Sequence, residues 1–67
     1  MLAIGTIIET PLILNPGSPM ERTIPREGTV VAAPTERGMY RVVWTETTYG
    51  QSGYVHADDV TVVSVPA

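Results

Sequence analysis

The segment from Met39 to Thr45 constrains the fold more than any other part of the chain, because polar and apolar residues alternate along it. Tyr40, Val42 and Trp44 fall on one face of an extended chain. The opposite face is mixed and carries Met39, Arg41, Val43 and Thr45. A period of two predicts a β-strand with one side turned to a core.

The rest of the chain is divided into short runs by six Gly and six Pro. No helical periodicity lasts beyond about one turn, which is too short for a stable helix. Further strands are predicted at Leu2–Ile8, Leu12–Leu14, Thr29–Ala33, Gly53–His56 and Val60–Val65. Turns are predicted at Asn15–Pro19, Thr35–Gly38, Glu46–Ser52 and Ala57–Asp59.

Two prolines limit what the first part of the chain can form. Pro11 confines Leu12–Leu14 to an edge or a short new strand, since proline has no backbone N–H. Pro25 excludes a central strand or a helix interior from Met20–Arg26. We therefore expect that segment to be a loop, held on the core by Ile24.

These elements predict an all-β protein, a small barrel of five to six short antiparallel strands in one domain spanning residues 1–67. Closure removes the sheet edges that a short meander would leave open. A chain this small buries little apolar surface and, without cysteine, has no disulfide to compensate. We expect Val42 and Val55 in the core, with Tyr40 and Trp44 closing it.

The charge of −3 rests on four Arg and seven acids spread along the chain. Nucleic-acid binding needs clustered cations, so we expect no nucleic-acid partner. No apolar stretch approaches the roughly 20 residues of a membrane span, and Met1–Ile8 lacks the charged start of a signal peptide. We expect a cytoplasmic protein, and the Lys-free composition is typical of a bacterial or phage gene of high GC content.

Four segments share a further pattern: Leu14–Pro19, Gly28–Val31, Gly38–Val42 and Gly53–Val60. Together they resemble the bacterial SH3 (SH3b-like) domain family, over roughly Ile7–Val63. The resemblance implies an SH3-like barrel that binds peptidoglycan or peptides. The arginine usual in the family's loop is absent here, Pro16 interrupts that loop, and Met39 stands where an aromatic residue is usual.

Aromatic side chains are the first candidates for a binding surface. Tyr49 lies in a polar turn beside Gly50, and Trp44 and Tyr54 could flank it. Such a groove suits an extended peptide, a glycan or a flat base. The alternative is that these rings cap the core.

His56 and Asp58 form the second candidate, because alternate positions of a strand face one way. They could act as metal ligands, or they could belong to the turn before the last strand. A metal site needs three or four ligands and the chain has no other His or Cys, so we expect no metal, cofactor or catalytic residue. Arg22 and Arg26 are expected to be solvated, with binding of an anion as the alternative.

Three functions remain open on these residues. The first is a non-enzymatic binding module for a protein or peptide partner, with Trp44, Tyr49, Tyr54, His56 and Asp58 as its candidate binding residues. The second is recognition of peptidoglycan or a cell-wall peptide. The third is a homo-oligomeric assembly protein that pairs through an edge strand such as Leu2–Ile8.

Overall fold

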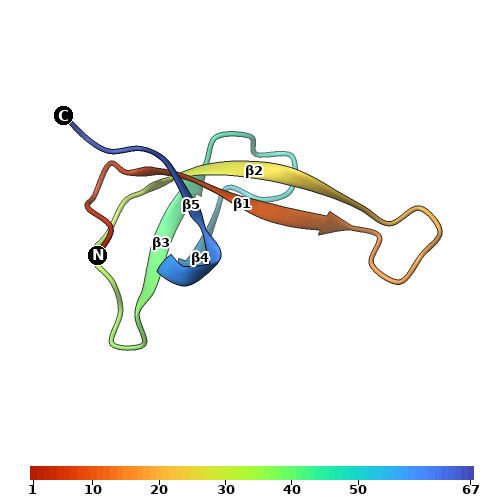
Figure 1. Cartoon of the computed structure of the whole chain (residues 1–67), viewed down its shortest axis with the longest axis horizontal. Coiled ribbons are helices and arrows are strands. Elements are labelled where there is room, and N and C mark those ends of the chain that lie inside the picture. The colour runs from red at the N-terminus through yellow and green to blue at the C-terminus, as the bar shows by residue number, and fades with distance from the viewer.

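The structure is a computed structural model that describes all of residues 1–67, and it is all-β, as predicted (Figure 1). Its elements are β1 (Ile7–Leu14), β2 (Arg22–Val30), β3 (Met39–Trp44), β4 (Ser52–His56), the 3-10 turn η1 (Ala57–Asp59) and β5 (Thr61–Ser64). The five strands form one antiparallel sheet in the order β4-β3-β2-β1-β5. No helix is long and apolar enough to cross a membrane.

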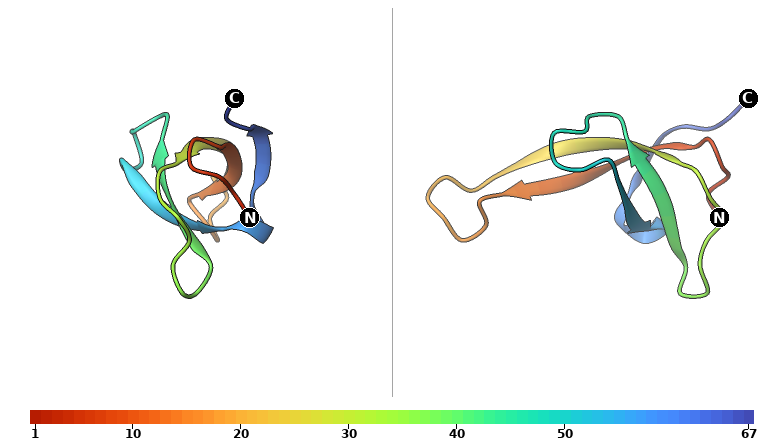
Figure 2. Two further views of the ribbon diagram at one scale, coloured as in Figure 1. Left: turned by 90° about the vertical axis from the view of Figure 1, so that its left-hand side faces the viewer. Right: turned by 180° about the vertical axis from the view of Figure 1, so that it is seen from behind.

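The sheet is curved but not closed. β4 and β5 are its two edges, and no ladder joins them. η1 carries the chain from β4 at one edge to β5 at the other, and Figure 2 shows the curvature of the strands. The expected closure into a barrel is therefore not made by backbone pairing.

The core lies where the alternation of β3 places it. Tyr40, Val42 and Trp44 are buried, and Val55 of β4 joins them, which confirms these four predictions. The complete buried apolar cluster is Ile8, Val30, Tyr40, Val42, Trp44 and Val55. The Tyr40 hydroxyl is not left unpaired, because it accepts a hydrogen bond of 3.0 Å from the backbone N–H of Leu2.

The expected strand at Leu2–Ile8 is wrong in its first part, since β1 begins at Ile7. The backbone turns at Gly5, whose φ of 95° favours glycine, and the N–H of Thr6 donates to the carbonyl of Ala3. β1 also lies between β2 and β5. Ile7 and Ile8, the part of Leu2–Ile8 that lies in β1, are paired on both sides and so do not offer the free edge that the assembly hypothesis needs.

The expected loop at Met20–Arg26 is also wrong. β1 and β2 form one long hairpin, in which Pro11 lies directly opposite Pro25. Antiparallel pairs alternate between those that exchange backbone hydrogen bonds and those that do not. Val30 donates a backbone hydrogen bond to Thr6 and accepts one from Gly5, just before β1 begins. Counting back along β2 from Val30, Pro25 falls at a pair that does not exchange backbone hydrogen bonds. Neither proline then removes a ladder bond, because each would direct its N–H outward.

The outer part of this hairpin projects from the sheet as an arm, defined here as residues 10–26 (Figure 1). β5 contacts β1 only at Ile7–Glu9, and β3 contacts β2 only at Gly28–Val30. Beyond those points the arm has two strands and two free edges. Proline on each edge is a known protection against pairing with another chain.

Trp44 is held between two glycines on the neighbouring strands. A Cβ placed on Gly28 of β2 would lie 2.8 Å from Trp44 Cε3, and one on Gly53 of β4 would lie 3.2 Å from Trp44 Cζ2. Both distances are shorter than ordinary van der Waals contact. Three adjacent strands therefore meet at a ring that only glycine neighbours accommodate.

We predict that Gly28→Ala destabilises the protein by about 1–3 kcal/mol, because the new methyl group must displace a buried ring. Gly53→Ala should have a smaller effect in the same direction, as its Cβ has more room. Urea unfolding followed by Trp44 fluorescence measures both. Equal stability of Gly28→Ala and the wild type would show that the ring moves freely.

Candidate functional site

The core face of the hairpin continues into the arm. Leu12 follows the buried Ile8 by four positions, so the two side chains share a face of β1. Leu12 is paired with Ile24 of β2. Both arm residues are only half-buried, whereas Ile8 is fully buried. The arm thus presents an apolar surface that no strand of the sheet covers.

The loop between β3 and β4, residues 45–51, lies beside this surface and leaves a cavity of about 300 Å³. We call this cavity the arm groove. Its lining residues are Leu12, Ile24, Pro25, Arg26, Glu27, Thr45, Glu46 and Tyr49. Apolar side chains come from the arm, while the loop supplies an aromatic ring and a carboxylate.

Arg26 fastens the 45–51 loop to the arm. Its guanidinium carbon lies 4.1 Å from the centroid of the Trp44 ring, the geometry of a cation–π contact. Its Nη2 donates to the carbonyls of Tyr49 at 2.9 Å and Gly50 at 3.3 Å. The expectation of a solvated Arg26 is therefore wrong. Arg26 lies opposite Thr10, on the core face of β2. The sequence did not predict this position, because Pro25 indicated a loop where β2 is found.

The guanidinium of Arg26 already interacts with other groups of the protein. Its Nε is buried and has no hydrogen-bond partner, so the electron-rich face of Trp44 is the compensation beside it. A ligand anion would have to compete with the ring and two carbonyls. Arg26 therefore shapes the arm groove without offering it a free cation.

A second set of contacts fixes the start of the loop. The backbone N–H of Thr45 donates to the Glu27 carbonyl at 3.0 Å, and its Oγ1 donates to Glu27 Oε2 at 2.9 Å. These bonds continue the contact of β3 with β2 by one residue. They also hold the Glu27 carboxylate at the rim of the arm groove.

Glu46 is oriented in a similar way. Its Oε1 accepts a hydrogen bond of 2.6 Å from Thr48 Oγ1 and one of 3.1 Å from the Thr48 backbone N–H. The Thr48 hydroxyl, followed by that N–H, lowers the pKa of the Glu46 carboxyl below its ordinary value. The groove therefore keeps this negative charge to a lower pH than an unbonded glutamate would.

The three predicted aromatic residues do not form one surface. Tyr49 lies in the arm groove and is 48% exposed, while Trp44 is buried beneath Arg26. Tyr54 is paired with Arg41 on the face of β3 and β4 opposite the core. Trp44 thus contributes through Arg26, and Tyr54 belongs to another side of the sheet.

His56 and Asp58 do lie together, next to η1. The backbone N–H of Asp58 donates to His56 Nδ1 at 3.2 Å, which caps η1, and Asp58 Oδ2 is 3.5 Å from the same nitrogen. A nitrogen that accepts the capping bond carries no proton, so it cannot also donate to the carboxylate. No group of three or more His, Cys, Asp or Glu is placed to hold a metal ion.

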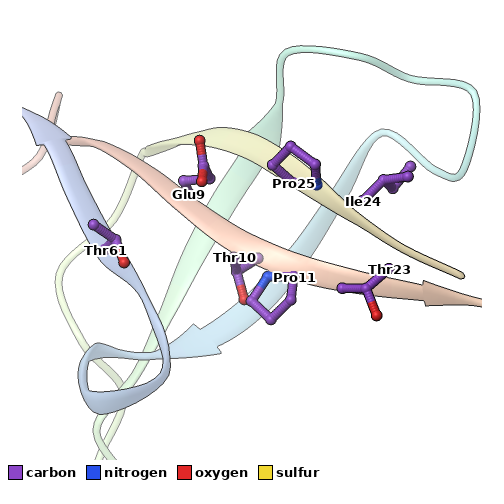
Figure 3. A pocket seen from close by; sticks show the side chains of 7 residues that line it. All are labelled: Glu9, Thr10, Pro11, Thr23, Ile24, Pro25 and Thr61. Carbon is purple, nitrogen blue, oxygen red and sulfur yellow. The ribbon is translucent and has the colours of Figure 1, made fainter.

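A second cavity, of about 250 Å³, lies along the arm and β5. Figure 3 shows its lining residues, Glu9, Thr10, Pro11, Thr23, Ile24, Pro25 and Thr61. Threonine and proline predominate, and Ile24 is the one large aliphatic side chain among them. It offers less apolar surface than the arm groove.

Comparison of the chain with protein-family models, with curated proteins and with solved structures finds no match. The interpretation of the site therefore rests on its geometry.

We predict that Arg26→Lys releases the 45–51 loop, because an ammonium group cannot stack on Trp44 and reach two carbonyls in the same planar arrangement. The loss of stability should be about 1–2 kcal/mol. Amide hydrogen exchange at Gly50 and its neighbours should become faster. Arg22→Lys is the matched control, since Arg22 is an exposed arginine on the same strand. Equal effects of the two variants would contradict the role of Arg26.

We predict that Thr48→Val raises the pKa of Glu46 toward its ordinary value, with Thr47→Val as the neighbouring control. An NMR titration of the Glu46 carboxyl carbon measures the change. Because the folded-state pKa is lowered, the bond stabilises the fold above the unfolded-state pKa, and this contribution is lost as the pH falls through the folded-state pKa. An unchanged titration in Thr48→Val would show that the hydroxyl bond is not formed.

Proposed function

We propose that the protein is a non-enzymatic binding module and that the arm groove binds an extended segment of a partner protein. The observation that carries this proposal is the continuation of the core face past the core, at Leu12 and Ile24, into a groove of about 300 Å³. Half-buried aliphatic side chains beside an exposed tyrosine are typical of a surface that a partner completes. Of the five residues first considered for binding, Tyr49 is the one that lines the groove, and Trp44 contributes only through Arg26 above it.

The form of the groove favours a peptide over a small molecule. Its lining comes from the two-stranded arm and the 45–51 loop. The arm itself projects from the sheet (Figure 1). Pro25 has no N–H to offer along the adjoining edge of β2. Recognition would therefore rest on side chains at alternate positions of the bound segment more than on strand addition.

We further propose that the chain is SH3-like in its organisation. The strand order β4-β3-β2-β1-β5, the long first hairpin and the 3-10 turn before the last strand support this proposal. The link between the two edge strands would then be η1. The SH3b-like resemblance also makes peptidoglycan the alternative ligand for the same module.

A homo-oligomer is the second candidate function, and one observation favours it. β5 is an edge strand whose four residues, Thr61–Ser64, are all exposed and uncharged. Such an edge lacks the usual protection against pairing with another chain. This surface replaces Leu2–Ile8 as the candidate for assembly.

Selection from a random peptide display library on the immobilised full chain tests the proposed function. A selected peptide, made synthetically, should bind with chemical-shift changes at the arm groove. We predict that Leu12→Glu weakens its binding about tenfold or more, because a charge then replaces an apolar groove side chain. Ile13→Glu is the matched control, since Ile13 is the next residue, is 54% exposed and lines neither cavity.

Three outcomes would overturn the proposal. The first is that no peptide is selected. The second is that selected peptides bind away from the groove. The third is that Leu12→Glu and Ile13→Glu have equal effects on binding. Retention of the wild type on purified peptidoglycan in the absence of selected peptides would favour the cell-wall alternative, and sedimentation as a dimer blocked by a charge in β5 would favour assembly.

A further inference from the structure

The charged groups around the arm groove are unevenly distributed. Glu27 of β2 and Glu46 of the 45–51 loop both line it, together with the apolar side chains of Leu12 and Ile24. The single cation in the lining is Arg26, and it is bound to Trp44 and to the carbonyls of Tyr49 and Gly50. The lining therefore carries two carboxylates against one guanidinium, a net charge of −1.

Each carboxylate also keeps one oxygen available. Glu27 accepts the Thr45 hydroxyl bond at Oε2, and Glu46 accepts both Thr48 bonds at Oε1. Glu27 Oε1 and Glu46 Oε2 make no hydrogen bond within the protein. The threonine bonds orient the two groups, so less side-chain freedom is lost when a ligand donor binds. Two oriented acceptors beside an apolar surface are complementary to a cation on a hydrophobic segment.

We infer that the occupant of the arm groove is a cationic segment of a partner protein, with an apolar side chain on Leu12, Ile24 and Tyr49 and a Lys or Arg side chain on Glu27 and Glu46. This inference rests on the proposed function and adds the chemistry of the ligand. The aliphatic or aromatic side chain contributes burial of apolar area. The cation contributes selectivity and a faster encounter with a protein of net charge −3.

Arginine fits the two acceptors better than lysine does. Its planar guanidinium carries five donors in a fixed arrangement, against three on the lysine ammonium, and its aliphatic stem can cover apolar surface. The hydrogen bonds from Thr48 lower the pKa of the Glu46 carboxyl, so this group stays an ionised acceptor. A segment with an acidic residue at this position would be excluded by repulsion.

The test is a second selection, made from the same random peptide library on the wild type and on Glu27→Gln/Glu46→Gln. Glutamine retains an oxygen for the threonine bonds, so the groove should keep its form. Glu21→Gln/Glu36→Gln is the matched control, because it removes the same net charge at exposed positions that line neither cavity.

Peptides selected on the wild type and on the control should be enriched in Arg and Lys next to an apolar residue. On Glu27→Gln/Glu46→Gln the cationic enrichment should disappear while the apolar preference remains. A wild-type-selected peptide should bind this variant about tenfold more weakly at low salt, a difference that shrinks as salt is added.

The possible failures are distinguishable. Peptides that bind the groove of the wild type without cationic enrichment, or that bind both double variants equally, would overturn the inference and leave the proposed function standing. If no peptide is selected on the wild type, or none maps to the groove, both are overturned. Sedimentation of the wild type as a dimer that Glu27→Gln/Glu46→Gln dissociates would identify an arginine of a second copy as the cation instead.

Discussion

The contact between Arg26 and Trp44 is the interaction on which the candidate site depends. Gly28 and Gly53 leave room for the Trp44 ring between their strands, and Arg26 lies over that ring. The same guanidinium binds two carbonyls of the 45–51 loop. A buried core residue therefore determines where a surface loop lies. If the ring shifted, the loop would lose its attachment and the arm groove would lose one wall.

The arm combines an accessible apolar surface with prolines on both of its free edges. Its strands continue the hydrophobic alternation of the core. In an ordinary hairpin, free edges of this kind would favour pairing with another chain. Pro11 and Pro25 lie opposite one another, and each places its ring where an outward N–H would be. The backbone is thus blocked for strand addition while the side chains of Leu12 and Ile24 stay accessible. This separation suits a surface that recognises side chains.

The sequence predicted the part of the fold where local pattern and tertiary environment agree. The alternation in β3, the turn at Gly38 with its φ of 77° and the short β4 were all predicted, because strand, turn and core preferences coincide there. The arm was predicted only in part: Leu12–Leu14 and the turn at Asn15–Pro19 agree with the structure, but Met20–Arg26 was expected to be a loop. Proline is a reliable sign against a strand only when its N–H would be bonded. Whether it would be depends on register, and register is a property of two strands together.

The same limit explains why the site was located only in part. Tyr49 was identified from its own neighbourhood, an aromatic residue in a polar turn. Leu12 and Arg26 acquire their roles through partners distant in the sequence, Ile24 in one case and Trp44 in the other. Tyr54 was grouped with Tyr49 by proximity along the chain, but strand alternation turns it to the opposite face.

The small size of the core is relevant to the function of the arm. Only eight of 67 residues are buried, so the folded state has a small margin of apolar burial. Leu12 and Ile24 lie where they add little to that core, and an arm of polar residues would fold with less exposed apolar surface. They line a groove whose other wall is the 45–51 loop, and Arg26 holds that loop in position. This placement is explained if another molecule completes their burial. A segment bound there would cover the side chains that the sheet leaves open, and because it binds only the folded state, it would also stabilise the fold.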